Sequence, residues 1–405
     1  RGFRLQPSTP MKKDARPGAA APLGNYQNEI YAGEVTGRVP GQAVNVEELE
    51  GRARQRLAPG AYGYVAGGAG AEDTMRANRA AFRRWLIVPR LLRNTAVRDL
   101  AVEILGTRMA APVLLAPIGV QSIVRPDAEL AVARAAASVG LPLVASTAAS
   151  RTLEAIAAAM GAAPRWFQLY WPGDRALTKS LLARAQRAGY GAIVVTLDTW
   201  QLGWRPRDLQ HSYLPFLRGE GLANYFADPV FRAALARPPE EDPRAAVEHF
   251  LQVFSDATVT WEDLSFLRQN TTLPLVLKGI LHPDDAAEAV ALGMDGIIVS
   301  NHGGRQVDGA IGALDALPGV VAAVNGRLPV LFDSGIRHGA DAFKALALGA
   351  RAVLLGRPYL WGLAVDGEEG VRRVLRGLLA ELDLTLALAG HTRPDQLGRN
   401  ALERI

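Results

Sequence analysis

The 405-residue sequence contains no cysteine, no long apolar run and no run of basic residues. Without thiols, the chain has no disulfide, no thiolate nucleophile and no metal bound through cysteine. It shows neither an apolar stretch that would cross a bilayer nor the core of a signal peptide, so a cytoplasmic location is the simplest expectation. The pI of 9.6 alone would allow nucleic-acid binding, but the arginines are scattered among acids, which favours an ordinary solvated surface.

Hydrophobic residues make up 49% of the chain and charged residues 21%, which is an ordinary globular composition. One α/β barrel of about 250 residues with extensions fits this length better than two or three separate domains. Residues 1–24 are rich in Pro, Lys and Arg without any pattern, and we expect them to be a disordered extension. Residues 25–405 are expected to form a single domain.

Short apolar runs of strand length recur from Pro112 onwards, each followed by a helical pattern. Alanine-rich helical segments lie between them, for example at 127–139, 175–188, 284–292 and 340–348. The apolar runs cover residues 112–116, 141–146, 165–170, 192–197, 274–279, 296–301, 329–334 and 352–356. Eight such units in succession predict a (β/α)8 TIM barrel, in which right-handed crossovers place all strand carboxyl ends at one mouth.

Other segments lie outside this repeat. Residues 45–82 have a helical pattern, with a turn expected at Pro59-Gly60, and residues 85–106 are expected to close one end of the fold. Residues 199–273 separate the fourth strand from the fifth, and so long an insertion at the mouth of a barrel is usually a lid. An apolar stripe from Val371 to Leu386 predicts a packing helix that ends at Gly390.

Mostly polar residues follow the apolar strands at the predicted mouth, where side chains of a barrel converge on a ligand. Each of them taken singly could be a helix cap or a core residue, but packing alone does not explain the whole set. We therefore expect the active site here. The residues are Gly119, Ser146, Gln168, Tyr170, Thr196, Asp198, Lys278, Ser300, His302, Asp333, Gly356 and Arg357.

The segment from Ser300 to Gly309 carries the clearest chemistry. His302 is a candidate base, and Arg305 has a guanidinium fork that suits a carboxylate, with two glycines between them that let the backbone turn tightly. Asp198 could accept a hydrogen bond from His302 and raise its basicity. Lys278 could form a Schiff base or could act as a fixed cation beside a reduced flavin, and the neighbouring histidine and arginines favour the second role.

Two further segments predict a phosphate site. Residues 333–337, Asp-Ser-Gly-Ile-Arg, follow the seventh strand, and residues 356–358, Gly-Arg-Pro, follow the eighth strand and open a helix. The loops after these two strands, together with a helix N-terminus, are the usual phosphate seat of this barrel. Such a seat alone does not separate flavin enzymes from isomerases or aldolases that act on phosphorylated substrates.

Beyond these local patterns, the sequence resembles the FMN-dependent α-hydroxy-acid oxidising family, in order from about residue 26 to the C-terminus. Within that family it is most similar to the lactate 2-monooxygenases, through residues 28–31, 203–209 and 215–231 and through Gly119. The family motifs match at residues 64–67, 116–119, 167–170, 196–198, 278–279, 300–306, 333–337 and 356–358.

The resemblance implies a role for each matching residue. His302 would be the base, supported by Asp198, and Arg205 and Arg305 would hold the substrate carboxylate. Tyr64 and Tyr170 would bond the carboxylate and hydroxyl of the substrate, and Lys278 would stabilise the anionic reduced flavin. No metal is expected. FMN would be bound by Lys278 together with Pro117, Ile118, Gly119, Ser146, Gln168, Thr196, Ser300, Asp333, Ser334, Gly335, Arg337, Gly356 and Arg357.

The resemblance further implies oxidation of L-lactate, or a similar small L-2-hydroxy acid, with O2 by a homotetramer or homo-octamer. If the lid retains the keto acid, the products are acetate, CO2 and water, whereas early release of the keto acid gives an oxidase that also releases H2O2. A quinone-linked dehydrogenase, a phosphate-binding isomerase or aldolase barrel that uses Lys278, and a non-catalytic barrel are weaker alternatives.

Overall fold

The computed structural model describes residues 22–35 and 45–405. Of the disordered extension expected over residues 1–24, residues 1–21 lie outside this described part. Leu23 and Gly24 belong to a short 3-10 helix, η1 (Leu23–Asn25), in which the Gly24 N–H donates to Asp383 Oδ2 at 2.7 Å. Leu23 and Gly24 are therefore not disordered, because this hydrogen bond ties η1 to the C-terminal helix.

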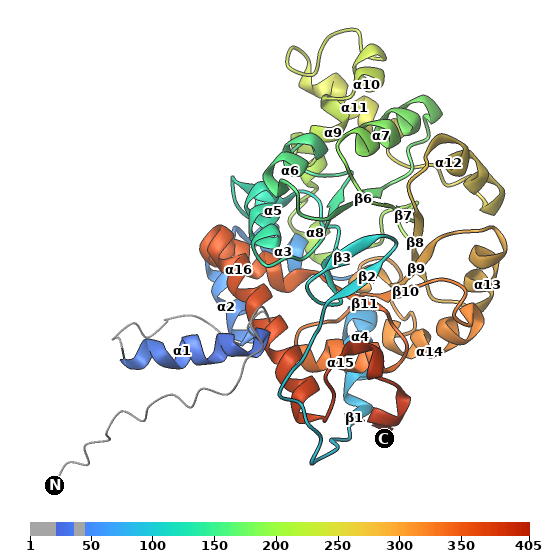
Figure 1. Ribbon diagram of the computed structural model, residues 1–405. Coiled ribbons are helices and arrows are strands. Elements are labelled where there is room, and N and C mark those ends of the chain that lie inside the picture. The colour runs from blue at the N-terminus through green and yellow to red at the C-terminus, as the bar shows by residue number, and fades with distance from the viewer. Residues whose placement is uncertain (1–21, 36–44) are drawn as a thin grey trace.

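Eight parallel strands form a closed barrel at the centre of the protein (Figure 1). Their order around the barrel follows their order in the chain, and the last strand closes the barrel by pairing with the first. The predicted (β/α)8 barrel is thus confirmed, and each apolar run that predicts a strand overlaps one. The strands are β4 (Val113–Leu115), β5 (Leu143–Ser146), β6 (Arg165–Leu169), β7 (Ile193–Thr196), β8 (Leu275–Ile280), β9 (Gly296–Val299), β10 (Val330–Phe332) and β11 (Ala352–Leu355).

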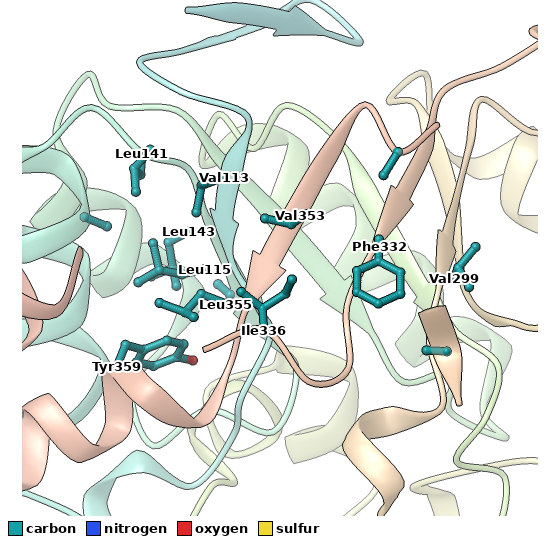
Figure 2. Packing of buried hydrophobic residues seen from close by; sticks show 14 of the residues in the cluster. Val113, Leu115, Leu141, Leu143, Val299, Phe332, Ile336, Val353, Leu355 and Tyr359 are labelled. Atoms are coloured by element: carbon teal, nitrogen blue, oxygen red, sulfur yellow. The ribbon is translucent and has the colours of Figure 1, made fainter. Parts of the chain in front are cut away.

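Side chains along each strand alternate between the barrel interior and the surrounding helices. In β4, Leu114 belongs to the interior cluster, whereas Val113 and Leu115 belong to the outer cluster. Figure 2 shows this outer layer, in which Leu355 and Tyr359 lie close to Leu115. Both layers are buried, which explains why most strand residues are apolar on both faces.

A two-stranded hairpin closes the barrel at the amino ends of its strands. It consists of β2 (Val102–Ile104) and β3 (Thr107–Met109), and Ile104 and Met109 join the interior cluster. The indole N–H of Trp166, inside the barrel, donates to Thr107 Oγ1 at 2.8 Å. Of residues 85–106, which were expected to close one end of the fold, β2 lies in this hairpin. The cavity lies at the opposite end of the barrel.

Helices surround the barrel, one after each strand (Figure 1). Several begin where a side chain accepts backbone N–H groups, as Asp174 does from Ala176 and Leu177. The last helix, α16, bends at Asp366-Gly367 and buries the predicted apolar stripe. Of the residues described, no helix combines the length and apolar character needed to cross a bilayer. The helices are α5 (Ala128–Ser138), α6 (Leu153–Met160), α7 (Arg175–Arg187), α12 (Leu264–Asn270), α13 (Pro283–Ala291), α14 (Ala313–Val324), α15 (Gly339–Ala347) and α16 (Arg357–Leu388).

The helical extension before the barrel contains α1 (Tyr26–Val35), α2 (Val46–Arg56), α3 (Pro59–Ala66) and α4 (Asp73–Arg83). The turn predicted at Pro59-Gly60 is wrong, because Pro59 is the first residue of α3. Proline lacks an N–H and has a helical φ angle, so it is well suited to the first turn of a helix. After α4, strand β1 (Trp85–Ile87) pairs antiparallel with the C-terminal strand β12 (Leu402–Arg404).

The insertion after β7 folds into short helices that carry their own aromatic core of Tyr225, Phe231 and Phe250. Helices α10 and α11 lie at the outer edge of the molecule in Figure 1. The expected insertion, residues 199–273, also includes α12, which instead takes its place in the helical ring beside α7. The part that departs from the barrel repeat is therefore shorter than expected. Its helices are α8 (Pro206–Gln210), η3 (Pro215–Arg218), α9 (Ala223–Phe226), α10 (Pro229–Ala233) and α11 (Pro243–Val253).

Candidate active site

A cavity opens at the carboxyl ends of the barrel strands and encloses about 1170 Å³ of space, part of it open to solvent. The structure brings most of the predicted site residues together in its wall. The predicted residues that line it are Tyr64, Pro117, Ile118, Gly119, Tyr170, Arg205, Lys278, His302, Arg305, Asp333, Ser334, Gly335, Arg337, Gly356 and Arg357. The remaining predicted residues, Ser146, Gln168, Thr196, Asp198 and Ser300, lie behind this lining.

His302 and Asp198 form the expected pair, with His302 Nδ1 and Asp198 Oδ1 separated by 2.7 Å. Burial lowers the pKa of His302, and Lys278 lowers it further, while Asp198 opposes both effects. Burial disfavours ionised Asp198, but Lys278 and His302 outweigh it and hold the pKa of Asp198 well below its usual range. The imidazole is therefore neutral and able to accept a proton at its other nitrogen, beside a permanent negative charge.

The backbone around His302 explains the two glycines that follow it. His302, Gly303 and Gly304 all have positive φ angles, of 57°, 65° and 75°. A Cβ at Gly304 would lie 2.7 Å from the Met75 backbone nitrogen, so only glycine fits there. The left-handed conformation of His302 itself is unfavourable by about 1–2 kcal/mol, and the bond from its N–H to Ser300 Oγ, at 3.0 Å, helps to hold it.

Lys278 is buried and donates to Ser300 Oγ at 2.9 Å. Its ammonium lies 3.4 Å from Asp333 Oδ2 and 3.8 Å from Asp198 Oδ2. Burial favours the neutral amine, but the two carboxylates outweigh it and raise the pKa of Lys278. A Schiff-base lysine needs a lowered pKa, so this geometry supports the fixed-cation alternative.

Arg205 and Arg305 place two positive charges in the cavity wall. The Arg205 side chain is only 5% exposed and donates to the Arg305 carbonyl at 2.9 Å and to Gln306 Oε1 at 2.6 Å. Burial, and then repulsion by Arg305, lower the pKa of Arg205 to about 10. Within residues 22–35 and 45–405, neither guanidinium forms an ion pair with a carboxylate of the protein. Two such cations fit an anionic ligand.

Tyr64 and Tyr170 supply the two hydroxyl groups expected beside these arginines. The guanidinium of Arg305 lies over the Tyr64 ring, 5.0 Å from its centre. Tyr170 packs against Phe254, with ring centres 5.2 Å apart, and burial raises the pKa of Tyr170 to about 12. Its hydroxyl therefore stays protonated near neutral pH and can donate a hydrogen bond to a substrate oxygen.

The polar side chains at the ends of neighbouring strands are bonded to one another. Ser146 Oγ donates to Gln168 Oε1 at 3.0 Å, and Gln168 Nε2 donates to Thr196 Oγ1 at 2.9 Å. These side chains are buried, and the Ser146 hydroxyl also accepts the N–H of Ala148, a residue of the cavity wall. They form an ordered polar layer behind the cavity.

A second group of cations lies in the cavity wall after β10 and β11. The pKa values of Arg337 and Arg357 are both lowered, mainly by burial. Repulsion from a neighbouring arginine lowers both pKa values further. Arg357 donates to the backbone carbonyls of Val65, Gly67 and Gly303. It is also the first residue of α16, whose N-terminus carries no side-chain cap. Two buried arginines, one of them at an uncapped helix N-terminus, fit the phosphate end of FMN, the cofactor that the resemblance implies.

Ser334, predicted to contact the cofactor, also shapes the site. Its Oγ accepts the N–H groups of Asn301 and Gly303, at 3.2 and 3.0 Å, and donates to Asp333 Oδ1 at 2.7 Å. It thereby fixes the loop on either side of His302. The described residues include no group of three or more His, Asp or Glu side chains that could hold a metal ion.

Two polar residues that bond the catalytic groups are missing from the predicted set. Thr199 Oγ1 lies 3.0 Å from Asp198 Oδ1 and 3.2 Å from His302 Nδ1. The Gln306 amide donates to the carbonyls of Asp198 and Gln201, at 2.7 and 2.8 Å, and accepts from Arg205. Both directly follow a predicted residue in the sequence, which is the signal that could have identified them.

Comparison with known proteins agrees with this geometry. The family described as "FMN-dependent dehydrogenase" matches residues 53–404. The chain is 46% identical to the "FMN-dependent alpha-hydroxy acid dehydrogenase qulF" of Penicillium citrinum, over 95% of this chain and 96% of that protein. It is 45% identical to an "L-lactate oxidase" of Lysinibacillus sphaericus, over 85% and 89%. A crystal structure of mandelate oxidase superposes with a TM-score of 0.80 at 40% identity, covering 90% of this chain and 99% of the other.

Proposed function

We propose a specific reaction for this chain, which belongs to the FMN-dependent dehydrogenase family and oxidises 2-hydroxy acids with FMN as its cofactor. Its substrate is L-lactate or a similarly small L-2-hydroxy acid. O2 takes the electrons, and the reaction ends in oxidative decarboxylation. The main evidence for this substrate class is that His302, Arg205 and Arg305 line the same cavity. Within the described residues, neither guanidinium forms an ion pair with a carboxylate of the protein. A carboxylate suits the arginines, and a hydroxyl on the neighbouring carbon suits the base.

The residues of the chain perform the first half of the proposed reaction. Arg205 and Arg305 bind the carboxylate and fix the α-carbon in one orientation. Tyr170 donates a hydrogen bond to a substrate oxygen, and neutral His302 accepts a proton from the substrate. The imidazolium that forms is stabilised by Asp198, whose carboxylate is already ionised.

FMN, when bound, would supply the two-electron redox chemistry that links oxidation of the substrate to reduction of O2 to H2O2. Lys278 lines the cavity as a buried cation that could stabilise negative charge on a reduced flavin ring, and Arg337 and Arg357 would hold the phosphate end.

The second half depends on how long the keto acid stays in the cavity. A retained pyruvate reacts with H2O2 through its carbonyl carbon and gives acetate, CO2 and water, which balances all atoms. The insertion supplies Thr199, Leu202, Arg205, Phe216 and Phe254 to the cavity wall, and an enclosing segment of this kind favours retention. The sequence likeness to lactate 2-monooxygenases in residues 203–209 and 215–231 supports the same outcome.

The nearest alternative is an oxidase that releases pyruvate and H2O2, and the likeness to proteins named L-lactate oxidase favours it. Quantifying acetate, pyruvate and free H2O2 per O2 consumed separates the two. Catalase must be absent from the assay, and pyruvate mixed with H2O2 but no enzyme gives the background rate of decarboxylation. Acetate equal to O2 consumed is the expected result, and stoichiometric free H2O2 would refute the monooxygenase. Glycolate and L-mandelate, assayed beside L-lactate, test the substrate size.

A further inference from the structure

Between η3 and α9, a side chain of the insertion bonds the barrel rim. That side chain is Glu220, which stands between Gly219 and Gly221, both with positive φ angles, of 75° and 77°. The Ser122 hydroxyl, in the loop after β4, donates to Glu220 Oε2. We call Glu220, Ser122 and Ser150 the Glu220 latch.

Ser150, in the loop after β5, completes the Glu220 latch. Its Oγ accepts the Ser122 N–H at 3.2 Å and lies 2.8 Å from Ser122 Oγ. Since the Ser122 hydroxyl donates to Glu220, the Ser150 hydroxyl donates to Ser122. The Ser150 N–H in turn donates to Oε1 of the buried Glu129 side chain at 2.9 Å. The latch therefore joins the insertion to two barrel loops at once.

The Glu220 latch lies directly behind the cavity wall. A Cβ at Gly221 would lie 2.7 Å from Val120, 2.8 Å from the Ala148 carbonyl and 3.3 Å from Phe216, and these three neighbours all line the cavity. Gly221 thus seats the insertion against the rim at van der Waals contact. Glu220 itself does not line the cavity, so any effect on the reaction passes through the wall residues.

The two sides of Glu220 differ in how firmly they are held. After it, Asn224 donates to the carbonyls of Ser146 and Thr147, at 3.2 and 3.0 Å, and accepts the N–H of Leu153 at 2.7 Å. Before it, the Phe216 ring packs on Phe250 and Phe254, which belong to the insertion and its continuation. Phe216 can therefore move with the insertion, and Glu220 is the polar tie that stops η3 from swinging away from the rim about the two glycines.

We infer that Glu220 is a positioning residue that, through its bonds to Ser122 and Ser150, keeps Phe216 against the cavity rim and slows departure of the keto acid. This inference rests on the proposed retention of pyruvate. Loss of a hydrogen bond to this partly solvated carboxylate should raise the pyruvate dissociation rate on the order of tenfold. Flavin reduction by L-lactate should stay within twofold, because Glu220 touches none of the reacting groups.

The test compares Glu220→Ala and Glu220→Gln, which keeps an acceptor oxygen, in the FMN-loaded enzyme. The matched control is Glu240→Gln, since Glu240 belongs to the same insertion but pairs with Arg232 away from the rim. Pyruvate dissociation is measured by displacement, followed through the flavin absorbance. Hydrogen exchange of backbone amides over residues 214–222 gives a readout that does not depend on turnover. Ser122→Ala is combined with Glu220→Ala in a double-mutant cycle.

The expected results are faster pyruvate dissociation and faster exchange in Glu220→Ala, partial rescue in Glu220→Gln, no change in Glu240→Gln, and no additional effect of Ser122→Ala on Glu220→Ala. Unchanged pyruvate dissociation in Glu220→Ala, or additive effects of the two alanine substitutions, would overturn the inference. Free H2O2 from the wild-type enzyme would instead refute the monooxygenase reaction, and the dissociation and exchange measurements would still decide the role of Glu220.

Discussion

Replacing Asp198 by Asn tests the electrostatic core of the site. Asp198 bonds His302 Nδ1 at 2.7 Å and is ionised, so it stabilises the imidazolium that forms when His302 takes a proton. Hydrogen bonds to charged groups contribute about 1.5–3 kcal/mol, which corresponds to a loss of about 10- to 150-fold in the rate of flavin reduction. The fold should persist, because Lys278 keeps Asp333 at 3.4 Å as a counter-ion.

The pH dependence of Asp198→Asn has a defined sign. Burial and Lys278 lower the pKa of His302 and Asp198 raises it, so loss of the aspartate lowers the pKa of His302 further. Reduction requires neutral His302, so the acid limb of the rate profile should move to lower pH while the maximal rate falls. Anaerobic stopped-flow measurement of flavin bleaching by L-lactate across pH gives both quantities.

A matched control is Thr199→Val, which removes a neutral hydroxyl 3.2 Å from the same nitrogen and should slow reduction only a few-fold. A bleaching rate for Asp198→Asn within twofold of the wild-type rate, or an acid limb that moves upward, would contradict the assignment.

Three further predictions concern the substrate clamp, the pH dependence of stability and the closed end of the barrel. Arg205→Met should raise KM for L-lactate by about 10- to 150-fold through loss of a charge-assisted contact, and an unchanged KM in steady-state assays would remove Arg205 from the clamp. Burial raises the pKa of Glu129 from 4.5 to about 7. Between about pH 4.5 and 7 the folded protein therefore keeps this proton while the unfolded chain releases it. The free energy of unfolding should fall by about 3 kcal/mol as the pH rises through this range. Glu129→Gln should lose that part of the pH dependence of Tm, and parallel Tm profiles for the two proteins would refute the buried-acid assignment. Thr107→Val leaves the Trp166 indole N–H without its partner inside the barrel, which should lower the free energy of unfolding by about 1–3 kcal/mol in urea titrations and leave flavin reduction unchanged; Thr95→Val, at a surface loop, is the control.

The barrel could be predicted from the sequence because its strands are apolar on both faces. Each run such as Gly296–Val299 is continuous, and a polar residue such as Ser300 follows directly where the strand leaves the core. In a closed parallel barrel the carboxyl ends of all strands lie at the same mouth. Residues that follow the strands in the sequence are therefore expected to lie close together in space.

Other features depend on contacts between distant segments, which a local pattern does not contain. Arg357 bonds the carbonyls of Val65 and Gly67, nearly 300 residues earlier in the chain, and this pairing follows only from the packing of α3 against the mouth. Pro59 begins α3 rather than forming the predicted turn, and the sequence alone does not distinguish the two because proline suits both. The insertion shows no strand–helix repeat, so neither its aromatic core nor the Glu220 latch could be located from the sequence.

The most direct test of the site is anaerobic mixing of the FMN-loaded protein with L-lactate, for the wild type and for His302→Ala. Both proteins should hold FMN, since the arginines after β10 and β11 and the polar layer behind the cavity are intact in each. The wild-type flavin should lose its visible absorbance on mixing, and the flavin of His302→Ala should keep it. Bleaching of the His302→Ala flavin at the wild-type rate would show that the proton of the substrate is taken by some other group.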